Sequence, residues 1–241
     1  MLNVFIGWDK REVAAYDACV KSIVKRTKIP IQIIPIKIDP LRESGLYIRE
    51  YYIDDNHIRR DAIDNKPFST DFSFSRFLVP FLSHYRGWSM FVDCDFIFTA
   101  PLDELFEERD ESMAVHVVKQ VQEVKDLYKM DGCLQVSYQR KNWSSLMLFN
   151  CSHEQSQNLT PHIVNNETGS YLHRFHWCDD NLIGDLSEDW NFLATPKREL
   201  PDKTPRGIHY TEGGPWFDGY KDVPYAELWV QEAIGSSDEQ N

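Results

Sequence analysis

The chain has 241 residues, of which 42% are hydrophobic and 13% aromatic, and its formal net charge is −12 at pH 7. That composition suits one sizeable packed α/β domain and excludes wholesale disorder. The acidic balance argues against a nucleic-acid partner or an anionic membrane surface, because both need a positive field. A small anionic ligand can still bind where a metal ion or a few local cations reverse the sign.

The cysteines and the N-terminus bear on the compartment. The five cysteines are far apart and form no C-x-x-C pair, which predicts reduced thiols and no zinc site. The opening MLNVFIGWDK lacks the basic-then-apolar layout of a signal peptide, and no stretch approaches membrane-spanning length. We therefore expect a cytoplasmic protein with no membrane span, whose N-x-S/T sequons occur by chance.

The first third of the chain predicts a strand, a helix and a second strand. Residues 3–7 (NVFIG) are apolar and end at a glycine, and residues 13–24 carry apolar side chains at helical spacing. The isoleucine-rich segment 29–38 contains two prolines, which place it near a sheet edge or in a bulge. Residues 44–70 are polar, aromatic and aperiodic, which predicts a long surface excursion of the kind that often binds ligands.

The rest of the chain continues the alternation of helices and strands. A helix is expected over 74–85, then a buried strand over 90–92 that continues through 96–98, then an acidic helix after Pro101. This order predicts an α/β fold with a mainly parallel sheet flanked by helices, in a single domain spanning 1–241. Further strands are expected at 113–118, 145–149 and 207–211, short helices near 180–186 and 224–234, and a frayed tail at 235–241.

The sequence FVDCDFIF at 91–98 carries a pair of carboxylates in an apolar run. In an extended chain residues i and i+2 point to the same side, so Asp93 and Asp95 can face one ion. Such a pair is costly unless it is solvated, paired or metal-bound, and open α/β sheets bind ligands at the carboxyl ends of strands. The pattern favours a metal site over two solvated turn residues that cap the next helix.

A second element, GIHYTEGGPWFDGY at 207–220, supplies a candidate third ligand. A neutral imidazole from His209 joined to two aspartates gives a mixed nitrogen and oxygen site suited to Mn²⁺, with Mg²⁺ as the alternative. The simpler interpretation is a loop histidine beside a structural aromatic residue.

Four stretches in order resemble the retaining GT-A glycosyltransferases of the glycogenin and lipopolysaccharide galactosyltransferase type, family 8. FIGWDKREVAAYDACVKSI is similar to the nucleotide-binding strand and helix of that family, and FSRFLVPFL places Arg76 where the family has an arginine that contacts the donor sugar. FVDCDFIFTAPLDELF is similar to the D-x-D strand, and GIHYTEGGPW to the element whose histidine completes the metal site. The resemblance implies the GT-A (nucleotide-diphospho-sugar transferase) fold, with a nucleotide-binding half at about 1–100 and an acceptor-side half at about 101–220.

The resemblance also implies roles for individual residues. Sugar would pass from a nucleotide diphosphate donor, UDP by the family pattern, to a carbohydrate or other hydroxyl acceptor, with retention of configuration. Asp93, Asp95 and His209 would hold the ion. WCDDNLIGDL at 177–186 is similar to the helix start beneath the donor sugar, which makes Asp180 and Asp179 catalytic candidates beside Arg76, unless they are helix N-caps. The donor-contacting residues would be Ile6, Gly7, Trp8, Asp9, Arg76, Asp93, Cys94, Asp95, Gly214 and Trp216.

Two departures from the family pattern limit this transfer of roles. Gly214 stands where a phosphate-contacting lysine is expected, so the metal, Arg76, Arg206 or backbone N–H groups must meet the diphosphate charge. The family's Asn-Ala-Gly appears as Trp-Ser-Ser at 143–145, with Asn142 shifted by one.

Three other functions fit parts of the pattern. A metal-dependent nucleotidylyltransferase usually opens with a Gly-rich loop, which FIGWDKRE lacks. A degenerate transferase that only holds a carbohydrate or nucleotide sugar is compatible with the two departures. A hydrolase would place its carboxylates roughly 5–9.5 Å apart across a substrate, whereas neighbours on one strand suit a single ion better.

Overall fold

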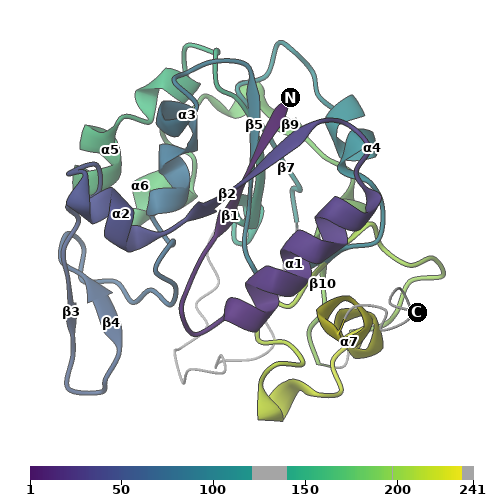
Figure 1. The fold of residues 1–241 in the computed structure, drawn as a ribbon. Helices are drawn as coiled ribbons and strands as arrows, with labels where there is room; N and C mark the ends of the chain where they lie inside the picture. Colours follow the sequence, from purple (N-terminus) through teal and green to yellow (C-terminus); the bar gives the residue numbers. More distant parts are fainter. Residues whose placement is uncertain (121–139, 197, 235–241) are drawn as a thin grey trace.

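A computed structural model describes residues 1–120, 140–196 and 198–234 (Figure 1). Its central sheet has the strand order β2-β1-β5-β8-β7-β9. Neighbouring strands pair in parallel except at β8, which runs antiparallel to both β5 and β7. The predicted α/β fold with a mainly parallel mixed sheet is confirmed. The strands are β1 (Leu2–Gly7), β2 (Ile31–Ile36), β5 (Trp88–Val92), β7 (Val115–Val117), β8 (Leu146–Asn150) and β9 (Ile183–Asp185).

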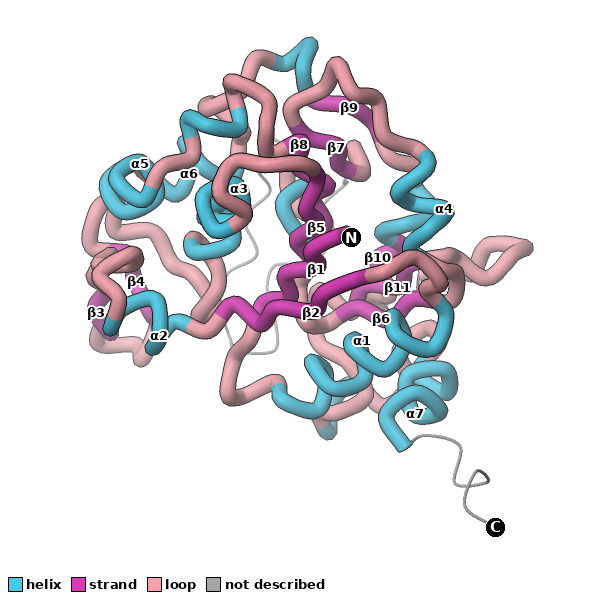
Figure 2. Tube along the Cα trace, turned by 45° about the horizontal axis from the view of Figure 1, so that its top comes forward, coloured by secondary structure: helices cyan, strands magenta, loops and turns pink. Residues whose placement is uncertain are grey.

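Helices cover both faces of this sheet. The long helix α1 and the C-terminal α7 lie on one side, and α3, α5 and α6 lie on the other (Figures 1 and 2). The apolar side chains of α1 recur at helical spacing, so one face of it is buried. None of the helices in the described ranges has the length and apolar character needed to span a membrane. The helices are α1 (Val13–Arg26), α2 (Ile38–Glu43), α3 (Val79–Leu82), α4 (Leu102–Glu107), α5 (Pro161–Asn166), α6 (Gly169–His173) and α7 (Ala226–Ile234).

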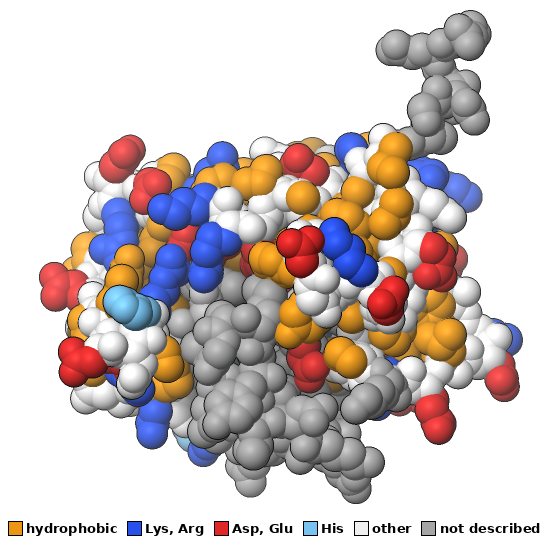
Figure 3. Space-filling view, turned by 90° about the horizontal axis from the view of Figure 1, so that it is seen from below, with side chains coloured by type: hydrophobic (Ala, Val, Ile, Leu, Met, Phe, Trp, Pro, Cys, Tyr) orange, Lys and Arg blue, Asp and Glu red, His pale blue; other side chains and the backbone are white. Residues whose placement is uncertain are grey.

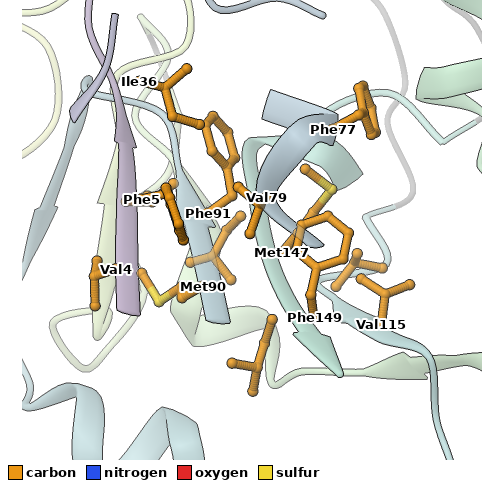
Figure 4. Packing of buried hydrophobic residues seen from close by; sticks show 14 of the residues in the cluster. Val4, Phe5, Ile36, Phe77, Val79, Met90, Phe91, Val115, Met147 and Phe149 are labelled. Carbon is orange, nitrogen blue, oxygen red and sulfur yellow. The ribbon is translucent and has the colours of Figure 1, made fainter. Parts of the chain in front are cut away.

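The core lies between the sheet and its helices. Phe5 from β1, Phe91 from β5 and Phe149 from β8 belong to one buried cluster with Val79 from α3 and Phe77 from the turn before it (Figure 4). All five side chains are almost completely buried. Because these strands are buried on both faces, their sequences are continuous apolar runs rather than alternating ones.

A second, smaller sheet corrects one prediction. Phe96–Phe98 (β6) does not continue β5, because the chain turns at Cys94 and Asp95 and β6 leaves the central sheet. It pairs antiparallel with β11 (Gly207–His209), which in turn pairs in parallel with β10 (Phe192–Leu193). Because of this turn, the two carboxylates lie at the end of β5 and not in the apolar interior of the central sheet, where their burial would be costly.

The excursion at 44–70 contains a hairpin that the aperiodic sequence did not predict. Strands β3 (Tyr51–Ile53) and β4 (Arg59–Asp61) pair antiparallel and project from the body of the molecule (Figure 1). A buried ion pair anchors them: Arg49 Nε and Nη2 lie 2.7 and 2.8 Å from the two carboxylate oxygens of Asp61. The same guanidinium donates to the carbonyls of Val164 and Glu167, so the hairpin is fixed to α5.

Two predicted helices differ from the structure. The segment 74–85 is a 3-10 turn followed by the short α3, and it ends where His84 and Tyr85 adopt positive φ. The segment 180–186 is a 3-10 turn followed by β9, because Ile183 and its neighbours extend the central sheet by pairing with β7. The helix expected at 224–234 is confirmed as α7, and the tail at 235–241 lies outside the described residues.

The tight contact at Gly207 gives a test of the second sheet. A Cβ at Gly207 would lie 2.2 Å from the carbonyl oxygen of Trp190, a backbone atom that cannot rotate away. We expect Gly207→Ala to lower the free energy of unfolding by about 1–3 kcal/mol, measured by urea denaturation. Gly219→Ala is the control, since nothing lies within 4 Å of a Cβ there. Equal losses in the two variants would contradict the close approach.

Candidate functional site

Asp93 and Asp95 stand at the carboxyl end of β5. The backbone N–H of Asp93 donates to the carbonyl of Ser145 at 2.9 Å, which fixes the start of the turn against the segment that leads into β8. Asp93 is 9% exposed, and Asp95 is half-buried. The strand end therefore presents two carboxylates in a small, poorly solvated volume.

The pairing of β6 with β11 brings His209 to these carboxylates. His209 lies opposite Phe96 in the register, and the N–H of Tyr210 donates to the carbonyl of Asp95 at 2.9 Å. The imidazole stacks on the ring of Phe96 with centroids 4.3 Å apart. One ligand atom from each of Asp93, Asp95 and His209 lies within 4.8 Å of the others.

The chemistry of these three residues fits a divalent cation. Two carboxylate oxygens and one imidazole nitrogen form the mixed donor set that Mn²⁺ accepts, and Mg²⁺ shares the preference for oxygen. Burial raises the pKa of Asp93 to about 6, with the nearby Asp95 adding to the rise and the Arg76 guanidinium opposing it. Like charges crowd the site, so a bound cation would relieve their repulsion.

A cavity of about 870 Å³ opens at this site. Figure 3 shows Lys and Arg side chains gathered on part of the face seen from below. The described lining mixes both signs of charge, in contrast to the strongly acidic chain as a whole. Its cations are Arg11, Lys66, Arg76, Lys141 and Arg174, and its acids are Glu12, Asp64, Asp93, Asp95 and Glu212.

One part of the cavity wall is neutral and polar. Ser144 Oγ lies 2.8 Å from His173 Nδ1, and burial lowers the pKa of His173 to about 3, so this imidazole stays uncharged near neutral pH. Asn142 is 9% exposed, and its Nδ2 has no hydrogen-bond partner among the described residues. A buried donor without a partner is costly, so this amide is a candidate to donate to a ligand in the cavity.

Arg76 joins the cavity to the carboxylate pair. Its Nη1 lies 2.7 Å from Asp93 Oδ1 and donates to the carbonyl of Ser144 at 2.9 Å. Arg76 is 5% exposed, and its two partners hold the guanidinium in one orientation. Arg76, Asp93, Asp95 and His209 are thus brought together.

The N-terminal residues predicted to contact base and ribose do not line the cavity. Ile6 and Asp9 are fully buried, and Asp9 is ion-paired with Arg11 at 2.6 Å. At Gly7 the close approach is made by the Phe72 ring, because a Cβ there would lie 2.4 Å from it. The next residue, Trp8, instead has the Lys37 ammonium 4.7 Å above its ring.

Three further predicted donor contacts are packing residues in this structure. Gly214 lies under the ring of Trp216, which would stand 1.9 Å from a Cβ, and Trp216 packs on Trp229. Cys94 is buried with its thiol 3.7 Å from Glu12 Oε2. None of Cys94, Gly214 and Trp216 lines the cavity.

The predicted catalytic carboxylates lie away from the cavity lining. Asp180 is 79% exposed at its side chain and pairs with Arg140 at 2.5 Å. Asp179 accepts a hydrogen bond from the side chain of Gln155. Arg206, considered above as a phosphate contact, is paired with Glu104 and Glu108. The roles predicted for these three residues gain no support from their placement.

The cavity also contains residues that the sequence analysis did not select. Glu12 lies three residues after Asp9, just before α1 begins, and nothing in this spacing indicates that it faces the D-x-D turn. Lys141 and His173 belong to no motif recognised in the sequence and reach the cavity through long-range packing. Pattern analysis has no signal for such residues, because their neighbours are set by the fold.

Comparison with known proteins supports this architecture. No protein-family model matches the chain. The glycosyltransferase GlyE of Streptococcus pneumoniae TIGR4 superposes with a TM-score of 0.59 at 15% identity, over 97% of this chain and 60% of GlyE. The galactosyltransferase LgtC superposes with a TM-score of 0.57 at 12% identity, over 96% of this chain and 95% of LgtC. The chain therefore has the GT-A glycosyltransferase fold.

Sequence similarity then gives the family. Protein CDI of Arabidopsis thaliana is 46% identical over 233 residues, which are 95% of this chain and 85% of CDI. The chain belongs to the same family as CDI.

Glu12 gives a test of the electrostatics of the site. Burial, with Asp95 and Asp9 adding repulsion, raises its pKa from 4.5 to about 8. The folded protein therefore keeps a proton that the unfolded chain has lost, so stability falls as the pH rises through this window. In EDTA, Glu12→Gln should lose less stability than the wild type between pH 5 and pH 8, by on the order of 2 kcal/mol. Unfolding curves at each pH measure this, and parallel profiles for the two proteins would contradict it.

Proposed function

We propose that this protein is a metal-dependent glycosyltransferase that moves a sugar from a nucleotide diphosphate donor to a carbohydrate or other hydroxyl acceptor. The observation that carries the proposal is the convergence of Asp93, Asp95 and His209 at the carboxyl end of β5, on the wall of an 870 Å³ cavity. Open α/β sheets bind their ligands at this edge. A GT-A fold with a cation-binding triad at the edge supports glycosyl transfer better than any other reaction considered.

The triad and Arg76 have different proposed roles around the donor. Asp93, Asp95 and His209 would hold a divalent ion, which would supply Lewis-acid stabilisation for the charge that gathers on the departing diphosphate. Arg76 orients Asp93 through their ion pair and adds positive charge beside it. The reaction needs this charge because the bond from the anomeric carbon breaks with electrons moving to the diphosphate.

Other cations can take the place of the family's phosphate-contacting lysine, where this chain has Gly214. Lys141 is 6% exposed and lines the cavity, and Arg174 lines it as well. We propose that they face the diphosphate together with Arg76, in place of Arg206. The neutral wall of Ser144, His173 and Asn142 then suits the sugar hydroxyls, which need hydrogen bonds rather than charge.

The finer assignments follow the family resemblance. We take UDP as the donor nucleotide, Mn²⁺ as the ion and retention as the stereochemical outcome. Asp180 and Asp179 stay candidates for a group beneath the sugar, although they would have to move to reach it. The activity of Asp180→Ala, measured in parallel with that of Asp95→Ala, tests whether Asp180 acts in catalysis.

Asp95→Ala tests the metal site directly. It should abolish Mn²⁺-dependent release of nucleotide in a screen of UDP- and GDP-sugars, because the ion loses a ligand. The free energy of unfolding should stay within about 1–2 kcal/mol of the wild type, since the site is partly exposed. Asp185→Ala is the matched control: its carboxylate is paired with Lys119, is 70% exposed and does not line the cavity. Full activity in Asp95→Ala would remove Asp95 from the mechanism.

The same screen separates the two alternatives. A binding module would bind a nucleotide sugar without releasing nucleotide. A nucleotidylyltransferase would instead form a nucleotide sugar from a sugar phosphate and a nucleoside triphosphate, with release of pyrophosphate. Neither result is expected.

A further inference from the structure

Asn191 contacts His209 on the side of the imidazole away from the carboxylates. It is fully buried at the end of the 3-10 turn Glu188–Asn191, just before β10. Its Oδ1 lies 2.9 Å from His209 Nδ1, and its Nδ2 donates to the carbonyl oxygen of Asn142 at 3.3 Å. On the other side of the ring, His209 Nε2 lies 3.4 Å from Asp95 Oδ1.

These contacts fix the position of the imidazole proton. The carbonyl oxygen of Asn142 can only accept a hydrogen bond, so the NH₂ group of the Asn191 amide must face it. The amide oxygen therefore faces His209, and since this oxygen also only accepts, the proton must be on Nδ1. In the neutral imidazole the lone pair is then on Nε2, the nitrogen that faces Asp95 Oδ1 at 3.4 Å. Neutral histidine in water favours the opposite tautomer, with its proton on Nε2.

We propose that Asn191 is a positioning residue that holds His209 in the Nδ1–H tautomer and so presents Nε2 to a divalent cation. This inference rests on the metal site of the proposed function. The close approach of Gly207 to the Trp190 carbonyl sets the turn against β11, which lets the next residue, Asn191, reach the ring. Stacking on Phe96 restricts the imidazole plane from one face.

The amide suits this position for an electrostatic reason. A metal-bound histidine commonly donates its second N–H to a carboxylate, a backbone carbonyl or water. Here Glu12, Asp93 and Asp95 already crowd the site with acidic groups. A further buried carboxylate would add to that repulsion, whereas an amide orients the ring without adding charge.

The tautomer can be read in metal-free protein by ¹⁵N–¹H NMR of the histidine side chains, with His209 assigned by its absence in His209→Gln. We expect wild-type His209 to carry its proton on Nδ1. Asn191→Leu removes the acceptor, so the Nε2–H form should become populated. Asn191→Asp keeps an acceptor oxygen in place and should restore the Nδ1–H form.

Manganese affinity gives the second readout, measured by electron paramagnetic resonance without donor. Asn191→Leu should bind Mn²⁺ about 10–100-fold more weakly than the wild type, while Asn191→Asp should bind more tightly than Asn191→Leu. Asn150→Leu is the matched control, because Asn150 is a buried amide that donates to the Glu111 carbonyl at the far end of β8. That variant should change neither the tautomer of His209 nor the affinity.

The outcomes separate this inference from the proposed function. A wild-type protein with its proton on Nε2 and tight Mn²⁺ binding would overturn only the role of Asn191. Wild-type affinity in a folded Asn191→Leu would also overturn it. A wild-type protein with the Nδ1–H tautomer that fails to bind Mn²⁺ would count against the proposed metal site itself.

Discussion

The candidate site depends on the antiparallel pairing of β6 with β11. This register places His209 opposite Phe96 and sets Tyr210 to donate to the Asp95 carbonyl, so residues over 100 positions apart in sequence become neighbours. A slip of one residue would turn the imidazole to the opposite face of the strand. The turn at Asp93–Asp95 is equally necessary, because it is where the chain leaves the central sheet for the smaller one. The backbone pairing and the turn therefore position the three side chains, and the chemistry of the site depends on that placement.

Electrostatics then explains why an acidic chain can suit an anionic donor. The net charge of −12 describes the whole surface, but the described cavity lining holds five cations beside five acids. Burial and mutual repulsion raise the pKa of Glu12 and of Asp93, which shows that the carboxylates are costly in this place. A cation bound among them would remove that cost and would also reverse the local sign. Such an ion would thus serve both the protein and the proposed donor.

The central sheet and the Asp93–Asp95 pair could be predicted because both depend on local patterns, whereas His209 was assigned to the pair through the family resemblance. Apolar runs identify buried strands, and two aspartates in such a run can be recognised without knowledge of the fold. The contacts of the N-terminal residues predicted to bind the donor were harder to infer from sequence. Gly7 has the small size that close approach requires, but only the fold shows that the Phe72 ring makes that approach. Likewise, nothing near Asn191 in sequence indicates a contact with His209, because that contact crosses between β11 and the preceding turn.

The change at Gly214 shows why individual positions are weaker evidence than the charge around a site. Judged from the C-terminal element alone, the loss of a lysine suggests a protein that cannot bind diphosphate. In the folded protein the ring of Trp216 packs on Gly214. Lys141 and Arg174, which come from other segments of the chain, line the cavity. Positive charge acts through space, so its source along the chain is unimportant when the distance to the ligand is similar. The departure from the family pattern is therefore compatible with the proposed transferase, and it is not by itself an argument for a degenerate binding module.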